Sequence, residues 1–245
     1  MPDNEFTLVE HLDELRKRII YCLIPFVICA VASLPFARSI LDFLRFPASG
    51  LIEKLAFFSP QEVALVYGKI SLVTALILSL PIIFYHLWKF ISPALEEKQK
   101  LYISSFIFWA SLAFLCGAVF GYLLLVPFSL KFLLALAGAD LQPVISLSKY
   151  ISFILALTVG SAIAFEMPVL VWLLNRMGIV NHRFLREKRR YVIIGIFVFS
   201  AVITPTTDPF NMTLLALPMI VLYEISIWIA RWNERQKPEA QGESA

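Results

Sequence analysis

Charge is scarce in this chain of 245 residues: Asp, Glu, Lys and Arg together make up 16% of it, against about 25% in soluble domains. Apolar residues reach 59%, and the mean hydropathy is +0.78. A soluble core cannot bury so much apolar side chain and leave a wettable surface. The composition therefore excludes a disordered chain, a nucleic-acid-binding domain and a typical cytosolic enzyme, and it predicts a polytopic membrane protein.

Glycine, cysteine and histidine are also few, with nine, three and three residues. No His-Glu-x-x-His, paired-cysteine, Gly-x-Ser-x-Gly or glycine-rich phosphate motif occurs. We therefore expect no metal, no cofactor, no catalytic residue and no enzymatic activity. The low glycine count also predicts that Gly-x-x-x-Gly packing is not prominent. Cys22, Cys29 and Cys116 fall inside apolar runs, which argues against a disulfide framework.

Six runs poor in charge are long enough to be membrane spans, which need about 20 apolar residues. They cover about 19–37, 70–91, 101–128, 150–174, 191–205 and 211–230. We predict an all-α fold, with one six-helix transmembrane domain over 1–235 and a disordered cytoplasmic tail over 236–245. Prolines in or near the spans predict kinked helices and a curved bundle; they are Pro81, Pro127, Pro168 and Pro218.

The basic residues predict the orientation, because cytoplasmic loops carry an excess of Lys and Arg. Fifteen of the 21 basic residues lie on the side that holds both termini. We therefore expect cytoplasmic N and C termini. The short span 191–205 predicts local thinning of the membrane around the last hairpin.

Between the spans, residues 38–69 are expected to form a long outer loop. The run Ser59-Pro60-Gln61-Glu62 predicts the start of a helix within it, with Ser as cap and Pro in the first turn. Asn181 is a candidate cap for a short basic helix over 183–190 in the last inner loop.

Glu166 and Glu224 lie inside predicted spans, where a carboxylate is costly and usually faces protein or a watery cavity. Glu166 is a candidate for a polar cavity that receives a ligand or deforms the membrane; the alternative is a hydrogen-bonded structural residue. Glu224 lies nearer the cytoplasmic end of its span and is placed to pair with Arg231. Since no basic residue lies inside the spans near either acid, an ion relay is less favoured.

Further acids gather on the predicted cytoplasmic side, with Glu10, Asp13 and Glu14 in one segment and Glu96 and Glu97 in another. Clustered carboxylates attract a basic peptide, because the arginine fork binds carboxylate in a bidentate manner. The alternative is a solvated charged face without a ligand.

The segment His11-Leu-Asp-Glu-Leu-Arg-Lys-Arg18 resembles the N-terminal signature of TatC, the polytopic subunit of the twin-arginine (Sec-independent) protein translocase. Further matches follow in family order at Leu80–Tyr85, Phe90–Leu95, Ala164–Pro168, Thr204-Pro205 with Asp208, and Tyr223–Ile225. Each motif is short, but together they extend over residues 11–225.

The resemblance implies a multi-pass protein of the bacterial cytoplasmic (inner) membrane. Such a protein is the signal-peptide receptor and core scaffold of the translocase, binding paired-arginine signal peptides on the cytoplasmic face. It assembles with TatA- and TatB-type single-span proteins, and with copies of itself, to export folded proteins using the proton-motive force. The alternative function is a secondary transporter or channel with Glu166 as an ion-coupling residue.

The resemblance also implies site residues. The family's second binding glutamate is replaced here by Gln99, so Glu96 or Glu97 is expected to substitute. The expected signal-peptide site consists of Glu14, Arg16, Phe90, Pro93, Glu96, Glu97 and Gln99. The expected partner contact consists of Thr204, Asp208, Asn211 and Met212, the last where the family often has glutamine.

Overall fold

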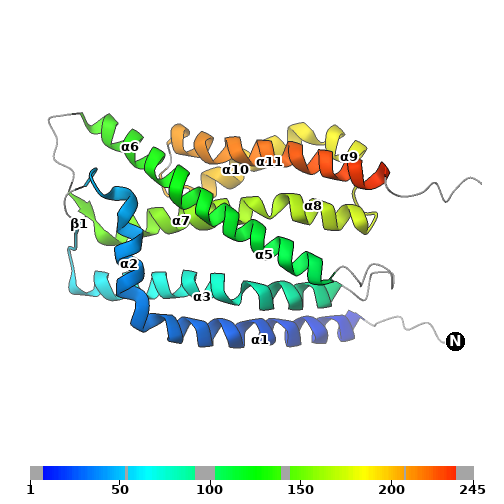
Figure 1. Ribbon diagram of the computed structural model, residues 1–245, viewed down its shortest axis with the longest axis horizontal. Coiled ribbons are helices and arrows are strands. Elements are labelled where there is room, and N and C mark those ends of the chain that lie inside the picture. The colour runs from blue at the N-terminus through cyan, green and yellow to red at the C-terminus, as the bar shows by residue number, and fades with distance from the viewer. Residues whose placement is uncertain (1–7, 53–54, 92–102, 139–143, 207, 236–245) are drawn as a thin grey trace, which may run out of the picture.

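The computed structural model is a bundle of long helices that lie side by side (Figure 1). It describes residues 8–52, 55–91, 103–138, 144–206 and 208–235. The long helices are α1 (Leu8–Ser33), α3 (Pro60–Ile91), α5 (Ile103–Phe120), α6 (Val126–Ala137), α7 (Leu147–Phe165), α8 (Met167–Arg176), α10 (Arg189–Ile203) and α11 (Pro209–Arg235). A π-helical turn, η4 (Gly121–Leu125), joins α5 to α6 without a break.

Short elements close the two ends of the bundle. We call the end that holds the starts of α1 and α5, the ends of α3, α8 and α11, and helix α9 (His182–Glu187) the basic end. The opposite, capped end holds η1 (Leu34–Phe36), α2 (Ala37–Arg45), η2 (Phe46–Ala48) and two strands. These are β1 (Leu55–Ala56) and β2 (Ile145–Ser146), which pair in parallel. Since α1 begins and α11 ends at the basic end, both ends of the bundle's chain path lie on one side (Figure 1).

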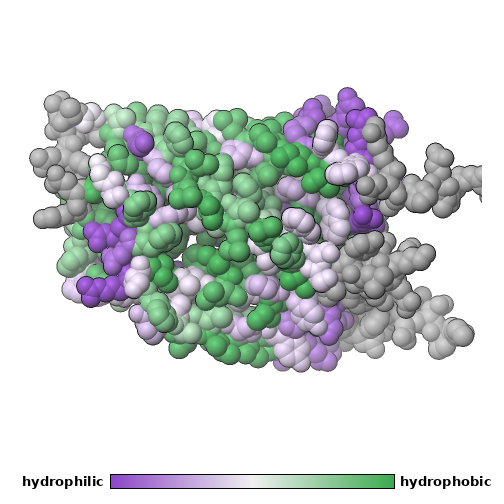
Figure 2. Space-filling model, viewed as in Figure 1, coloured by the Kyte–Doolittle hydropathy of each residue, from purple (hydrophilic) through white to green (hydrophobic). Residues whose placement is uncertain are grey.

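Within the described residues, five helical segments are long and apolar enough to cross a membrane. Helix α10, in the predicted fifth span, has 15 residues and is therefore about 22 Å long, against about 30 Å for a bilayer's hydrocarbon core. The predicted shortness of this segment is confirmed, and membrane thinning beside it stays a prediction. Figure 2 shows hydrophobic surface across the middle of the bundle and hydrophilic residues toward both ends.

The capped end is more ordered than a long loop. Leu41 and Leu44 of α2 are buried in a cluster with residues of α3, η4, α6 and α7. The Tyr122 hydroxyl donates to the Phe43 carbonyl oxygen at 2.6 Å, and the Tyr150 hydroxyl donates to the Leu44 carbonyl oxygen at 3.1 Å. The expected outer loop over 38–69 therefore contains a helix packed on the bundle, which is a correction to the sequence prediction.

The predicted helix start at Pro60 is confirmed, and its acid does more than cap. Glu62 accepts a hydrogen bond from the Phe58 backbone N–H at 2.8 Å. It also accepts bonds from the Ser146 hydroxyl and from the Ser148 backbone N–H. One carboxylate therefore ties the start of α3 to the start of α7.

Close packing of α5 on α7 depends on glycine, contrary to the prediction that Gly-x-x-x-Gly packing is not prominent. A Cβ atom at Gly117 would lie 2.7 Å from the Ser161 carbonyl oxygen, and one at Gly121 would lie 3.0 Å from the Thr158 Cα. Both distances are shorter than a normal contact with backbone. Gly117 and Gly121, four residues apart, thus let the two backbones approach closely.

Candidate functional site

The carboxylate of Glu14 lies on the first turns of α1 at the basic end. Arg18, one helical turn later, donates to it from Nη2 at 2.7 Å, as an i,i+4 pair. The side chains remain 25% and 16% exposed, respectively. Arg16 is exposed beside them. A partly exposed carboxylate of this kind can accept hydrogen bonds from a second guanidinium without breaking the first, because it has about four lone-pair positions.

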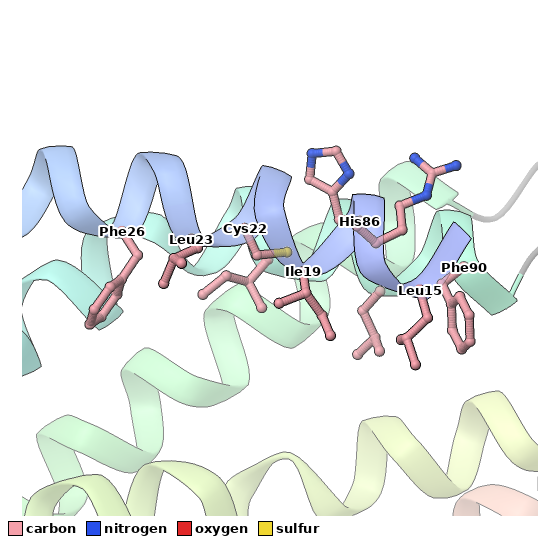
Figure 3. A pocket seen from close by; sticks show the side chains of 10 residues that line it. Leu15, Ile19, Cys22, Leu23, Phe26, His86 and Phe90 are labelled. Carbon is pink, nitrogen blue, oxygen red and sulfur yellow. The ribbon is translucent and has the colours of Figure 1, made fainter. Parts of the chain in front are cut away.

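An apolar cavity of about 330 Å³ lies next to this carboxylate, between α1 and α3. Figure 3 shows its labelled side chains, which come from successive turns of α1 and from the last turns of α3. Its lining is Leu15, Arg18, Ile19, Cys22, Leu23, Phe26, Ile83, His86, Leu87 and Phe90. Phe90, expected from the resemblance to belong to the binding site, therefore lines the same cavity as Arg18, which lies one turn from Glu14 on α1.

Arg18 joins the two parts of this site, and the sequence reasoning did not select it. Its guanidinium binds Glu14, its stem lines the cavity, and its Nε is buried without a hydrogen-bond partner among the described residues. The sequence signal was present, since Arg18 is the last residue of the N-terminal signature and lies at i,i+4 from Glu14.

The remaining expected binding residues, Pro93, Glu96, Glu97 and Gln99, lie outside the described residues. Helix α3 ends at Ile91, just before this segment.

Glu166 lies at the junction of α7 and α8 and is 8% exposed. Its backbone N–H donates to the Ile163 carbonyl oxygen at 3.1 Å, and its own carbonyl accepts from Leu170 at 2.9 Å. The side-chain Oε1 is buried and has no hydrogen-bond partner among the described residues. The α-helix is interrupted here because Pro168, in the first turn of α8, has no N–H to donate.

Glu224 pairs with a different arginine from the one expected. Its Oε2 accepts from Arg189 Nη2 at 2.6 Å, and the two side chains are 43% and 46% exposed. The prediction of a pair with Arg231 is therefore wrong. Arg189 begins α10, so the ion pair links the two helices of the last hairpin; sequence spacing along one helix could not indicate a partner 35 residues away.

The four expected partner-contact residues lie at the turn between α10 and α11. Thr204 is 4% exposed and donates to the Ser200 carbonyl oxygen at 2.8 Å. Asn211 is fully buried, and its Nδ2 donates to Asp208 at 2.9 Å and to Thr206 Oγ1 at 3.0 Å. Met212, in the same first turn of α11, is half-buried.

Asp208 caps α11 by accepting the Asn211 backbone N–H at 2.8 Å. Partial burial raises the pKa of its carboxyl, but hydrogen bonds from the backbone and side chain of Asn211 and from Thr206 outweigh burial and leave that pKa below its ordinary value. Thr204, Asp208 and Asn211 thus hold the turn together by hydrogen bonds within it. Of the four expected contact residues, Thr204 and Asn211 are buried, whereas Asp208 and Met212 are only half-buried.

A second polar network at the basic end was not predicted. Glu234, near the end of α11, accepts hydrogen bonds from the His182 backbone N–H at 2.7 Å, from the His182 ring and from Asn175 Nδ2 at 3.0 Å. Asn233 Nδ2 donates to Asn175 Oδ1 at 2.9 Å. Asn181 caps α9 as predicted, accepting from Phe184 at 2.7 Å. Among the described residues, no group of three His, Cys, Asp or Glu side chains is placed to hold a metal.

Comparison with known proteins agrees with this arrangement. Residues 10–218 match the family TatC, described as Sec-independent protein translocase protein (TatC). A relative of that name from Carboxydothermus hydrogenoformans is 34% identical, over 95% of this chain and 96% of its own. Another from Aquifex aeolicus is 38% identical, over 96% and 98%. A crystal structure described as the twin arginine translocase receptor TatC aligns with a TM-score of 0.84 at 37% identity, covering 92% of this chain and all of the other.

Proposed function

The chain belongs to the TatC family of Sec-independent protein translocases, and from that premise we propose that it is the signal-peptide receptor and core scaffold of a twin-arginine translocase. It recognises paired-arginine signal peptides at the basic end, which faces the cytoplasm of a bacterial inner membrane. It assembles there with TatA- and TatB-type single-span proteins and with further copies of itself, and the proton-motive force drives export of folded cargo.

One observation carries this proposal: the Glu14 carboxylate and the apolar cavity between α1 and α3 lie side by side. A signal peptide of this class presents arginines followed by an apolar stretch. The arginine can share the Glu14 carboxylate, and the residues after it can bury apolar surface against Leu15, Ile19 and Phe90. A carboxylate alone or an apolar cavity alone is common in membrane proteins. Here the carboxylate lies beside the cavity, just as the arginines of the signal peptide lie beside its apolar stretch.

Energetics show why one carboxylate is not enough. An exposed ion pair contributes about 0–1 kcal/mol, whereas a hydrogen bond to a charged, partly buried group contributes about 1.5–3 kcal/mol. Glu14 is shared with Arg18, so recognition of a second arginine needs another acid. We assign that role to Glu97 or Glu96, in the segment directly after α3, in place of the Gln99 position.

For the single-span partners we propose the outer turn and the short hairpin of α10 and α11. Asp208 and Met212 are the accessible members of the expected contact, while Thr204 and Asn211 keep the turn in shape. A partner helix beside α10 would cover side chains that are exposed here, such as Val202.

The test is site-specific photocrosslinking to a paired-arginine precursor in membranes. A photoreactive residue at Leu15 should crosslink the precursor, and Glu14→Lys should abolish that crosslink. Asp13→Lys is the matched control, since it makes the same charge change one residue earlier on an exposed position. Crosslinking that survives Glu14→Lys, or that Asp13→Lys abolishes equally, would contradict the proposed site.

A further inference from the structure

Helix α2 runs across the bundle at the capped end, rather than along it (Figure 1). Its level can be worked out from α1. From Ile19 to Ser33 the helix has 15 residues, and η1 adds three more, so together they rise about 28 Å. The hydrocarbon core of a bilayer is about 30 Å thick. If the apolar part of α1 enters the membrane at Ile19, α2 begins where the core meets the headgroups on the capped side.

One flank of α2 is covered with phenylalanine. Leu41 and Leu44 face the bundle and are buried. At 3.6 residues per turn, Phe36 and Phe43 fall to one side of that buried face, where they remain 63% and 60% exposed. So much exposed aromatic surface in two neighbouring side chains is costly in water.

The other flank of α2 is charged. Arg38, Asp42 and Arg45 are exposed there, with Arg45 Nη1 3.9 Å from Asp42 Oδ1. The direction of the aromatic flank is given by Phe43, whose ring stacks on Tyr122 of η4 with centroids 4.6 Å apart. Tyr122 lies in the third predicted span, so the flank with Phe36 and Phe43 faces the membrane side and the charges face away from it.

We propose that α2 is an interfacial helix that binds a phospholipid surface. Its phenylalanine flank inserts among the acyl chains of the leaflet at the capped end. Arg38 and Arg45 lie level with the lipid phosphates, whose negative charge they complement. This combination of an apolar flank, a basic flank and an axis across the bundle is what a helix lying in the interface requires. The hydroxyls of Tyr122 and Tyr150 donate hydrogen bonds to the backbone of α2. The anchored helix therefore fixes the height of the capped end relative to the membrane surface.

The test uses the full-length protein in phospholipid vesicles, with Cys22, Cys29 and Cys116 replaced by alanine and a nitroxide on one new cysteine. A nitroxide at Phe36→Cys should collide several-fold more with oxygen than with a water-soluble nickel chelate. A nitroxide at Asp42→Cys, on the charged flank of the same helix, should favour the chelate. As a second measurement that keeps the native cysteines, a photoreactive residue at position 36 should crosslink to phospholipid, and one at position 42 should not.

Equal access of the nickel chelate to positions 42 and 36 would overturn the proposal, as would absence of a lipid crosslink at position 36. Protection of position 36 that disappears when the protein is diluted in lipid would also overturn it, because it would assign the flank to contact between copies of the chain. Protection at position 36 but not at position 42, independent of dilution, supports the lipid contact.

Discussion

The contact between α5 and α7 makes a quantitative prediction at Gly117. An added Cβ would lie 2.7 Å from the Ser161 carbonyl oxygen and 2.8 Å from the Ala162 Cα. Both are backbone atoms of α7, which cannot move aside as a flexible side chain can. Gly117→Ala should therefore force the helices apart.

Overpacking of a tight contact costs about 1–3 kcal/mol, and replacing glycine by alanine in a helix returns about 0.5–1 kcal/mol. We expect Gly117→Ala to lower the free energy of unfolding by about 1–2 kcal/mol. At about 2–4 °C per kcal/mol for a chain of this size, Tm should fall by about 2–8 °C.

The assay is thermal unfolding of the purified protein in detergent, followed by circular dichroism. Gly195→Ala is the matched control, because Gly195 is also inside a helix and an added Cβ there meets nothing within 4 Å. That variant should be as stable as the parent or slightly more so. If Gly117→Ala and Gly195→Ala have the same Tm, the close approach of α5 and α7 is not what stabilises the bundle.

Three further predictions follow from other parts of the chain. Glu97→Gln should weaken binding of a paired-arginine peptide more than Gln99→Ala does, measured as Kd in nanodiscs; the reverse order would show that the second acid is misassigned. Glu224→Gln should lower Tm by no more than about 2–4 °C, since a half-exposed pair contributes about 0–1 kcal/mol; a larger loss in thermal unfolding would mean that the link to Arg189 is more than an exposed pair. Asp208→Asn should reduce the free energy of unfolding at pH 7, because folding lowers the pKa of Asp208. The difference in stability between the variant and the parent should shrink as pH falls below about 4 through the lowered pKa. Denaturation of both proteins at pH 7 and at a pH below about 4 checks this, and a difference that does not change with pH would contradict it.

The helices could be predicted from the sequence because lipid imposes a length and a polarity on every span. The start of α3 at Pro60, the Asn181 cap and the short α10 all follow from local rules of that kind. Local rules fail where partners are distant in the chain. Glu224 bonds to Arg189, and Glu62 to Ser146, across 35 and 84 residues, and no spacing within one helix indicates such pairs.

The candidate site was predicted in the same uneven way. The family signature identified Glu14 and Phe90, and the structure places them beside one cavity. The i,i+4 spacing within α1 accounts for the pair of Arg18 with Glu14, but it could not indicate that Arg18 also lines the cavity, since the cavity depends on how α3 packs against α1. The outer turn shows a further limit of sequence reasoning: Thr204 and Asn211 are polar, yet they are buried and bonded within the turn.

The most direct test of the central claim is a double-mutant cycle between the receptor and its peptide. The Kd of a paired-arginine signal peptide and of its paired-glutamine analogue would be measured in nanodiscs, for the parent protein and for Glu14→Gln. If Glu14 binds arginine, the parent should prefer the arginine peptide by about 10-fold or more, as a bond of about 1.5–3 kcal/mol requires, and Glu14→Gln should lose most of that preference. An unchanged preference in Glu14→Gln would contradict the account.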